Sequence, residues 1–153
     1  MGGSEGGKVS FPPSLMRAIG LDLGSKRIGV AVSDRSGTIA SPLTVIVRSG
    51  DEAVDHRRIA ALVAEEEAER VVVGLPLSLD GSIGPAARGA IDEAERLSSV
   101  VAVPVETFDE RLTTVAAERA LREQGVTTRA GRGVVDKVAA AVILQAWLER
   151  RGR

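Results

Sequence analysis

The sequence predicts an α/β fold in which helices flank a five-stranded mixed sheet. Three short apolar segments, 18–23, 27–34 and 36–48, follow one another with turn residues between them, as in an antiparallel meander of three strands. Two later segments, 70–76 and 100–108, are almost wholly apolar, which is typical of strands buried on both faces. Charged stretches with helical periodicity surround these segments, so the chain passes from the meander into βαβ-type strands.

Individual residues justify the elements in turn. Gly24 and Ser25 form a tight turn, so the first two strands make a hairpin. Pro104 places the last strand at a sheet edge, because proline cannot donate a hydrogen bond to a neighbouring strand. Apolar residues recur at helical spacing in four further segments. The expected helices cover residues 51–69, 85–98, 113–124 and 134–150.

The chain of 153 residues is long enough for one domain with its own core, and 44% of its residues are hydrophobic. We expect a flexible leader at 1–17, a single domain at 18–150 and a basic tail at 151–153. No apolar run reaches the roughly 20 residues of a membrane span, and the leader lacks the apolar centre of a signal peptide. A cytoplasmic protein with no membrane partner is therefore expected.

The composition excludes several classes of site. Without cysteine, thiol catalysis and cysteine-bound zinc are excluded, and the lone His56 cannot form a histidine metal cluster. We expect His56 to be an ordinary surface residue of a charged helix. Aromatic residues make up only 2% of the chain, which argues against base stacking on an aromatic platform. The net charge of −1 means that any contact with nucleic acid depends on a local group of basic residues.

Asp22 interrupts an otherwise apolar strand. Strand alternation places it on one face with only small neighbours, Ala18, Gly20 and Gly24. A buried carboxylate is unfavourable unless it is paired, hydrogen-bonded or bound to a metal. We therefore expect the small residues to leave room for a metal or a phosphate beside Asp22. The alternative is a structural aspartate that accepts hydrogen bonds from the turn.

Two further acidic sites lie later in the chain. Glu106, Asp109 and Glu110 cluster where a buried strand ends, and ligand sites in α/β sheets gather at the carboxyl ends of strands. Alternation does not settle which of them points inward, and acids at strand ends also occur on solvated surfaces. Asp136 begins a helical stripe that is otherwise composed of core residues. Its alternative role is to stabilise the helix through the N-terminal dipole.

Three acids from separate elements fit a site for hard divalent cations. Mg²⁺ and Mn²⁺ prefer carboxylate and water ligands and need neither histidine nor cysteine. Two such ions can activate a water molecule and stabilise the leaving oxygen in phosphodiester hydrolysis. The expected cofactor is therefore a pair of Mg²⁺ or Mn²⁺ ions.

Four collinear motifs resemble the YqgF/RuvX family of bacterial RNase H-like proteins over about residues 18–150. These motifs are GLDLGSKRIGVAVSD, VVVGLPLSLDGSIGP, VETFDERLTT and DKVAAAVILQAWL. The resemblance implies an RNase H-like fold and a metal-dependent nuclease. That nuclease would mature the 5′ end of pre-16S rRNA in ribosome biogenesis or, alternatively, resolve Holliday junctions in DNA recombination and repair. Matched by motif, the catalytic and metal-binding acids are Asp22, Glu110 and Asp136, with Asp109 as the alternative to Glu110.

The expected partner is nucleic acid, either a structured rRNA precursor or branched DNA. The candidate nucleic-acid contacts are Lys26, Arg27, Arg111, Arg129 and Arg132. The chain would act as a monomer or a homodimer, and a symmetric DNA junction needs two active sites and hence a dimer.

Two other function classes compete with the nuclease. An ATP-binding protein of the actin or sugar-kinase type also begins with an Asp-x-Gly hairpin, but it needs two such domains, and this chain has the length for one. A non-catalytic nucleic-acid-binding module would have no need for all three acids.

Overall fold

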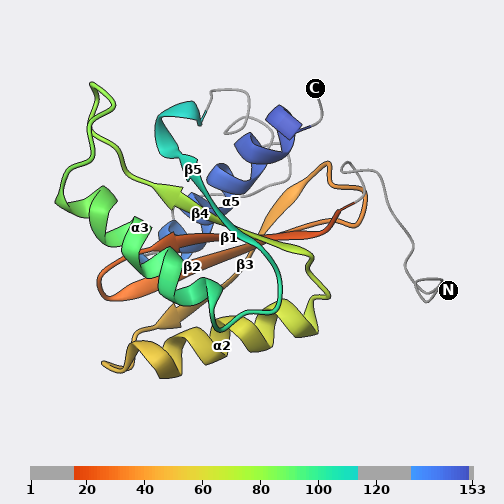
Figure 1. Ribbon diagram of the computed structural model, residues 1–153. Coiled ribbons are helices and arrows are strands. Elements are labelled where there is room, and N and C mark those ends of the chain that lie inside the picture. Colours follow the sequence, from red (N-terminus) through yellow and green to blue (C-terminus); the bar gives the residue numbers. More distant parts are fainter. Residues whose placement is uncertain (1–15, 114–131, 152–153) are drawn as a thin grey trace, which may run out of the picture.

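A five-stranded mixed sheet forms the centre of the computed structural model, which describes residues 16–113 and 132–151 (Figure 1). In sheet order its strands are β3 (Ala40–Val47), β2 (Arg27–Ser33), β1 (Ala18–Leu23), β4 (Arg70–Leu75) and β5 (Val105–Asp109). The first three strands of the chain pair antiparallel, whereas β4 runs parallel to both β1 and β5. The predicted meander with βαβ-type strands is confirmed, and β5 is an edge strand as Pro104 indicated.

Helices lie on both faces of this sheet (Figure 1). Their bounds are α2 (Glu52–Glu65), α3 (Pro85–Ser98) and α5 (Arg132–Arg151), and a short 3₁₀ helix, η2 (Glu110–Leu112), follows β5. Ile19 and Leu21 of β1 pack with residues of α2 and α3 on one face. Ala18 packs with Ala140 and Leu144 of α5 on the other face. The alternation predicted for β1 therefore separates two hydrophobic cores.

Local hydrogen bonds explain where the elements begin and end. Asp51 caps α2 by accepting hydrogen bonds from the backbone amides of Ala53 and Val54, as N-cap aspartates do. The strand predicted at 100–108 starts only at Val105, because the amides of Val100 and Val101 bond back to Leu97 and extend the end of α3.

Parts of the predicted organisation fall outside the described residues. These parts are the helix expected at 113–124, apart from its first residue, and most of the leader at 1–17 and of the tail at 151–153. The domain boundaries therefore remain a prediction. None of the helices in the described part of the chain combines the length and hydropathy needed to cross a membrane.

Glycines in β1 and β2 let α5 lie directly on the sheet. A Cβ atom on Gly20 would lie 2.8 Å from Cβ of Leu144, and one on Gly29 would lie 2.0 Å from the backbone oxygen of Asp136. The prediction that small residues leave room for a ligand is therefore wrong at Gly20, because α5 fills that space. Gly29 is the partner of Asp22 in the β1–β2 ladder, so the same close packing brings the start of α5 to the strand that carries Asp22.

Replacing Gly29 with alanine is expected to destabilise the fold, because the new methyl group meets backbone atoms of α5. We expect the free energy of unfolding, measured by urea denaturation, to fall by about 1–3 kcal/mol, the usual range for overpacking. Gly89→Ala in α3 is the control, because its Cβ would meet nothing within 4 Å. That variant should gain about 0.5–1 kcal/mol from helix propensity. Equal stability changes in the two variants would contradict the close approach of α5.

Candidate active site

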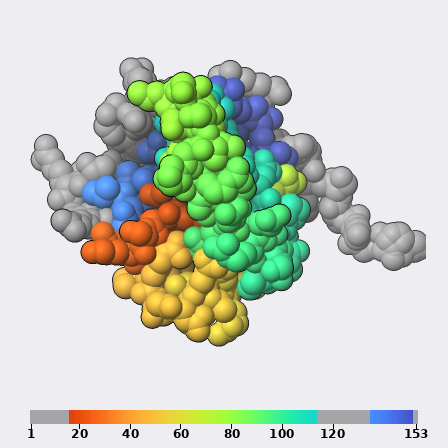
Figure 2. All heavy atoms as spheres, turned by 60° about the vertical axis from the view of Figure 1, so that its left-hand side comes forward, coloured from red at the N-terminus to blue at the C-terminus, as the bar shows by residue number. Residues whose placement is uncertain are grey.

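A cleft of about 520 Å³ opens at the carboxyl ends of β1 and β4, beside α3. Figure 2 shows α3 in green crossing this side of the molecule, with the orange β1–β2 turn to its left and the yellow α2 below. Asp22 and Glu110 line the cleft from the end of β1 and from η2. Arg48, which directly follows β3, and Glu93 of α3 line it as well. The carboxyl end of the sheet is where ligand sites of α/β folds gather.

Asp22 is a partly buried carboxyl near the end of β1. Burial raises its pKa above the usual 3.8, and the nearby negative charge of Asp136 raises it further. Among the described residues, no hydrogen-bond donor or ion-pair partner is found for its side chain. The alternative of a structural aspartate bonded to the amides of the turn is therefore not observed in this conformation.

Glu110 approaches Asp22 from η2. Its Oε2 atom lies over Gly74 of β4, where a Cβ atom would come within 2.9 Å of that oxygen, so the glycine makes room for the carboxylate. Burial raises the pKa of Glu110, and the charges of Asp22 and Asp109 add to this effect. Asp22 and Glu110 thus form a pair of mutually repelling carboxylates in one cleft, with no described cation between them.

The structure distinguishes Asp109 from Glu110. Asp109 caps η2 by accepting a hydrogen bond of 2.9 Å from the Arg111 amide, and its Oδ2 accepts one of 2.8 Å from Nη2 of Arg111. This side-chain hydrogen bond is the main cause of the lowered pKa of Asp109. Arg111 also donates to the backbone oxygen of Leu79 at 3.2 Å, which joins η2 to the loop before α3. Glu110 therefore lines the cleft, while Asp109 is engaged by Arg111.

Asp136 and Arg27 form an ion pair at the edge of this region. Nε of Arg27 lies 2.6 Å from Oδ2 of Asp136, and both side chains are about one-third exposed or less, at 30% and 27%. Arg27, one of the candidate nucleic-acid contacts, is thus paired with an acid in this conformation, with its side chain partly exposed. Asp136 lies near enough to Asp22 to raise its pKa.

Glu106, the third acid of the second cluster, lies outside the cleft. Its two carboxylate oxygens accept hydrogen bonds of 2.8 Å from Arg70 and 3.0 Å from Nε1 of Trp147. Both carboxylate oxygens of Glu106 are therefore occupied by neighbouring side chains at the edge strand, and they are not available to a ligand in this conformation.

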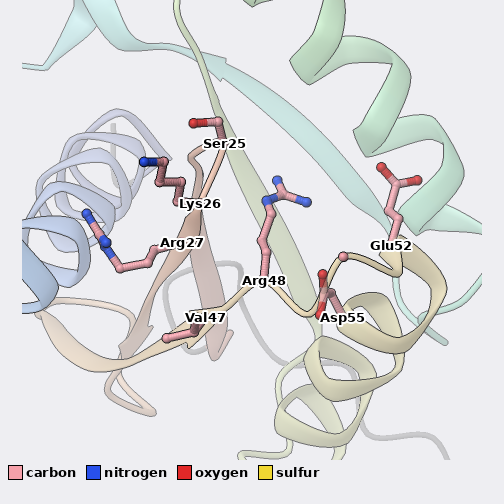
Figure 3. Close-up of a pocket in the computed structure, with 8 residues that line it drawn as sticks. Ser25, Lys26, Arg27, Val47, Arg48, Glu52 and Asp55 are labelled. Carbon is pink, nitrogen blue, oxygen red and sulfur yellow. The ribbon is translucent and has the colours of Figure 1, made fainter.

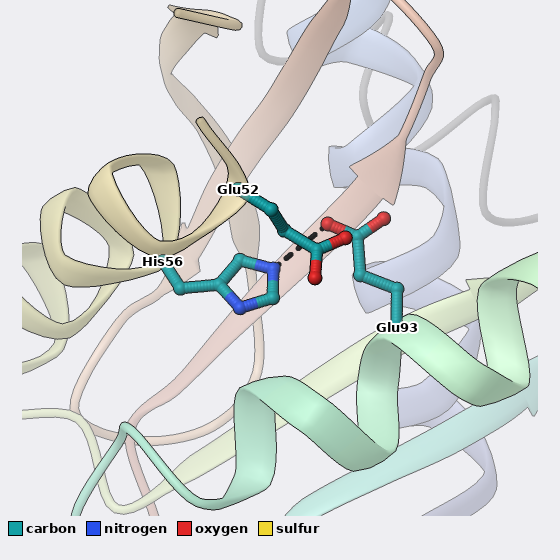
Figure 4. Close-up of side chains that lie close together, drawn as sticks. All are labelled: Glu52, His56 and Glu93. Atoms are coloured by element: carbon teal, nitrogen blue, oxygen red, sulfur yellow. Dashed lines mark hydrogen bonds and ion pairs between the residues drawn. The ribbon is translucent and has the colours of Figure 1, made fainter. Parts of the chain in front are cut away.

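A second acidic group, which was not predicted from the sequence, joins α2 to α3 (Figure 4). Glu52, His56 and Glu93 each place one ligand atom within 4.8 Å of the others, so this group could hold a metal ion. His56 is only 2% exposed and its Nε2 lies 2.8 Å from Oε2 of Glu93. The expectation of a surface histidine was wrong, because His56 shares the inward face of α2 with Ile59 and Val63.

Arginines already neutralise the acids of this group. Arg48 donates to both oxygens of Glu93 at 3.0 and 2.9 Å, and Arg96 donates to both oxygens of Glu52 at 2.6 and 3.0 Å. A divalent ion would have to compete with two bidentate guanidinium groups, which are among the stronger partners of a carboxylate. The Asp22–Glu110 pair has no such competitor among the described residues.

A second depression, of about 530 Å³, adjoins the cleft at Ser25 and Arg48 (Figure 3). Lys26 lines it and is exposed, and it makes no ion pair with any residue in the described ranges. Of the other predicted nucleic-acid contacts, Arg129 lies outside the described residues. Arg132 is the first residue of α5, but its side chain is not described.

Comparisons with known proteins match nearly the whole chain. A family model with the description "RuvX: Holliday junction resolvase" matches residues 16–150. A Mycobacterium sp. (strain KMS) protein provisionally named a pre-16S rRNA nuclease is 51% identical over 140 residues, covering 91% of this chain and 83% of its own. A protein of the same name from Anaeromyxobacter dehalogenans (strain 2CP-C) is 52% identical over 136 residues, covering 89% and 98%.

The solved structures match in fold. Thermus thermophilus RuvC aligns with a TM-score of 0.60 at 18% identity, covering 90% of this chain and 96% of that chain. RuvC in complex with a Holliday junction substrate aligns with a TM-score of 0.59 at 17% identity. Sequence identity at this level shows a shared architecture and no more. The predicted RNase H-like fold is confirmed by this match.

Asp22→Asn is expected to stabilise the metal-free protein. Because the pKa of Asp22 is raised in the folded state, the folded protein binds this proton more tightly than the unfolded chain, and ionisation lowers stability. The gain from the substitution should be absent below about pH 4 and grow as the pH rises to about 7. It should reach roughly 0.5–2 kcal/mol, the common range for replacing a destabilising group. Thermal unfolding of both proteins at several pH values, in the presence of a chelator, measures this difference in stability.

Asp34→Asn is the control of opposite sign. Although burial acts to raise it, hydrogen bonds from Ser36, Ile39 and Thr38 lower the pKa of Asp34, so its ionised form stabilises the fold. The Tm of this variant should be lower than that of the wild type over the same pH range. A neutral-pH Tm of Asp22→Asn equal to or below that of the wild type would contradict the electrostatic description of the cleft.

Proposed function

The chain belongs to the RuvX family, and we propose that it is a nuclease that cleaves phosphodiester bonds with the help of divalent metal ions. The enzyme class follows from the family, whose members are named for the cleavage of nucleic acids. The observation that carries the metal dependence is the Asp22–Glu110 pair, two carboxylates of raised pKa in one cleft. Asp22 and Glu110 would hold a divalent cation, whose charge would relieve their repulsion and stabilise the ionised form of both groups.

The residues present fit such an ion. Carboxylate oxygens are the ligands that Mg²⁺ and Mn²⁺ prefer, and Asp22 and Glu110 would hold the ion, with Asp136 as the third ligand. When bound, a pair of such ions lowers the pKa of the attacking water and neutralises charge on the leaving oxygen. Arg27 holds Asp136 at the edge of the cleft, and Lys26 offers a positive charge to a neighbouring phosphate of the substrate.

We infer that the substrate is the 5′ region of the 16S rRNA precursor, which places the protein in ribosome biogenesis in the cytoplasm. The names of relatives more than 50% identical support this assignment. A structured RNA has no two-fold symmetry, so a monomer is sufficient for this role. The exposed Lys26 is a candidate contact to its phosphates, and Arg111 becomes one if it leaves Asp109.

A Holliday junction is the alternative substrate. The description of the matching family model and the fold shared with RuvC favour it. Because a symmetric junction is cut at two equivalent positions, this role needs a homodimer with two active sites. A non-catalytic nucleic-acid-binding module is the least favoured function, since it gives no reason for the unpaired acids in the cleft.

Asp22→Asn and Glu110→Gln should each abolish most of the activity on the preferred substrate. We expect kcat/KM to fall by about 10²–10³-fold or more, the loss seen when one electrostatic stabiliser is removed from an active site. The assay uses a 5′-extended 16S rRNA fragment and a four-way DNA junction, each with Mg²⁺ or Mn²⁺. Asp92→Asn, which replaces a half-exposed acid on α3 that does not line the cleft, should retain full activity.

Asp109→Asn separates the two neighbouring acids. Because Asp109 is bound to Arg111 outside the cleft, this variant should lose less activity than Glu110→Gln. The opposite order would reassign the ligand to Asp109. If wild type and Asp22→Asn were equally inert on both substrates, the nuclease proposal would fail. If the wild type cleaved the DNA junction alone, the assigned substrate would be branched DNA and not the rRNA precursor.

A further inference from the structure

Arg48 connects the β1–β2 turn to the helices beside the cleft. Its Nε donates to the backbone oxygen of Gly24 at 2.7 Å, and its two Nη atoms donate to Glu93 at 3.0 and 2.9 Å. The backbone amide of Arg48 donates to the oxygen of Lys26 at 2.9 Å. In Figure 3 the Arg48 side chain extends from the end of β3 between the turn that carries Ser25 and Lys26 and the start of α2. All of its donor nitrogens are therefore engaged.

The turn that Arg48 holds begins at Gly24, two residues after Asp22. The amide of Gly24 donates to the backbone oxygen of Asp22 at 3.1 Å. A Cβ atom on Gly24 would lie 2.6 Å from the backbone oxygen of Arg27, so the chain here is tightly folded. Only Leu23 separates Gly24 from Asp22, so a displacement of the Gly24 carbonyl would shift the end of β1, which carries Asp22.

Glu93 and His56 keep the Arg48 guanidinium in place. The side chain of Glu93 is 9% exposed and that of His56 is 3% exposed, whereas that of Arg48 is 17% exposed. A buried carboxylate such as Glu93 is stable only when its oxygens are paired. Here Oε2 of Glu93 lies 2.8 Å from Nε2 of His56, so α2 and α3 meet at one buried charge (Figure 4). Arg48, just after β3, binds the same carboxylate.

We propose that Arg48, held by Glu93 and His56, is a positioning residue that fixes the turn after Asp22 and thereby the geometry with which Asp22 binds its metal ion. The inference rests on the proposed function, in which Asp22 is a metal ligand. Partners that orient a metal ligand typically change metal affinity or activity by about 10–100-fold when they are lost. The group Glu52–His56–Glu93 is accordingly part of an ion-pair network that supports the site and not a metal site itself.

The test compares Arg48→Gln and Arg48→Lys with the wild type by hydrogen exchange and Mn²⁺ titration. Arg48→Gln removes the contacts to Gly24 and Glu93, so amide exchange in peptides covering residues 22–28 should accelerate about tenfold or more. The Mn²⁺ dissociation constant, measured by calorimetry, should rise by about 10–100-fold. Lysine keeps the positive charge but lacks the planar guanidinium group. In Arg48→Lys, amide exchange and the Mn²⁺ dissociation constant should therefore lie between those of the wild type and those of Arg48→Gln.

Arg35→Gln is the matched control. It also removes one arginine–glutamate pair, with Glu67, but on the exposed surface away from the cleft. Exchange at residues 22–28 and Mn²⁺ affinity should be unchanged in this variant. If Arg48→Gln does not fold, Glu93→Gln is used for the same test, because it keeps the side-chain shape and weakens the hold on Arg48, although it also changes the contact with His56.

Kinetics distinguish positioning from general loss of stability. With saturating Mn²⁺, well below the Tm, Arg48→Gln should recover most of the wild-type kcat while its half-saturating Mn²⁺ concentration stays raised. Wild-type exchange at residues 22–28 together with wild-type Mn²⁺ affinity in Arg48→Gln would overturn the proposal. A wild-type protein that binds no Mn²⁺ at all would instead refute the proposed function, while the exchange measurement would still decide whether Arg48 holds the turn.

Discussion

The close packing of α5 on the glycines of β1 and β2 is the constraint on which the site depends. A side chain at Gly29 would overlap the backbone of Asp136, so the start of α5 lies directly against the strand paired with Asp22. This contact places Asp136 near Asp22 and lets Arg27 reach across to it. At Gly74, a missing side chain in the same way admits the carboxylate of Glu110. Two acids thus reach the end of β1 through positions that carry no side chain.

The charges around the cleft fall into two groups with opposite roles. Glu93 and Glu52 are fully paired with arginines, and they stabilise the junction of α2 and α3 beside the turn. Asp22 and Glu110 are left without a described cation, and burial raises the pKa of both. Residues that destabilise a fold persist where function requires them, and the proposed metal site would give the unpaired acids such a role. The paired group holds the framework, and the unpaired group is available for a ligand.

Much of the fold could be predicted from the sequence, because periodicity reports directly on which faces are buried. The meander, the buried β4 and the edge position of β5 all follow from local composition and from Pro104. The role of Gly20 could not be predicted, because a small residue leaves a space that either a ligand or a neighbouring helix can fill. Only the tertiary packing of Leu144 decides between them.

The arrangement of the candidate site could be predicted only in part, for similar reasons. Asp22 and Glu110 line one cleft as expected. The choice between Asp109 and Glu110 depends on the hydrogen bonds that Arg111 makes with Asp109, and these cannot be derived from strand alternation. The burial of His56 was missed although a signal existed. His56 and Glu93 each stand in an apolar helical stripe, which for a charged or polar residue indicates a buried partner.

Anomalous diffraction from crystals of the protein soaked in Mn²⁺ tests the central claim most directly, because it locates the ion without reference to any substrate. We expect a manganese peak between the carboxylates of Asp22 and Glu110, with Asp136 turned toward it and Arg48 still bound to Glu93. A peak at Glu52, His56 and Glu93, with none beside Asp22, would contradict it.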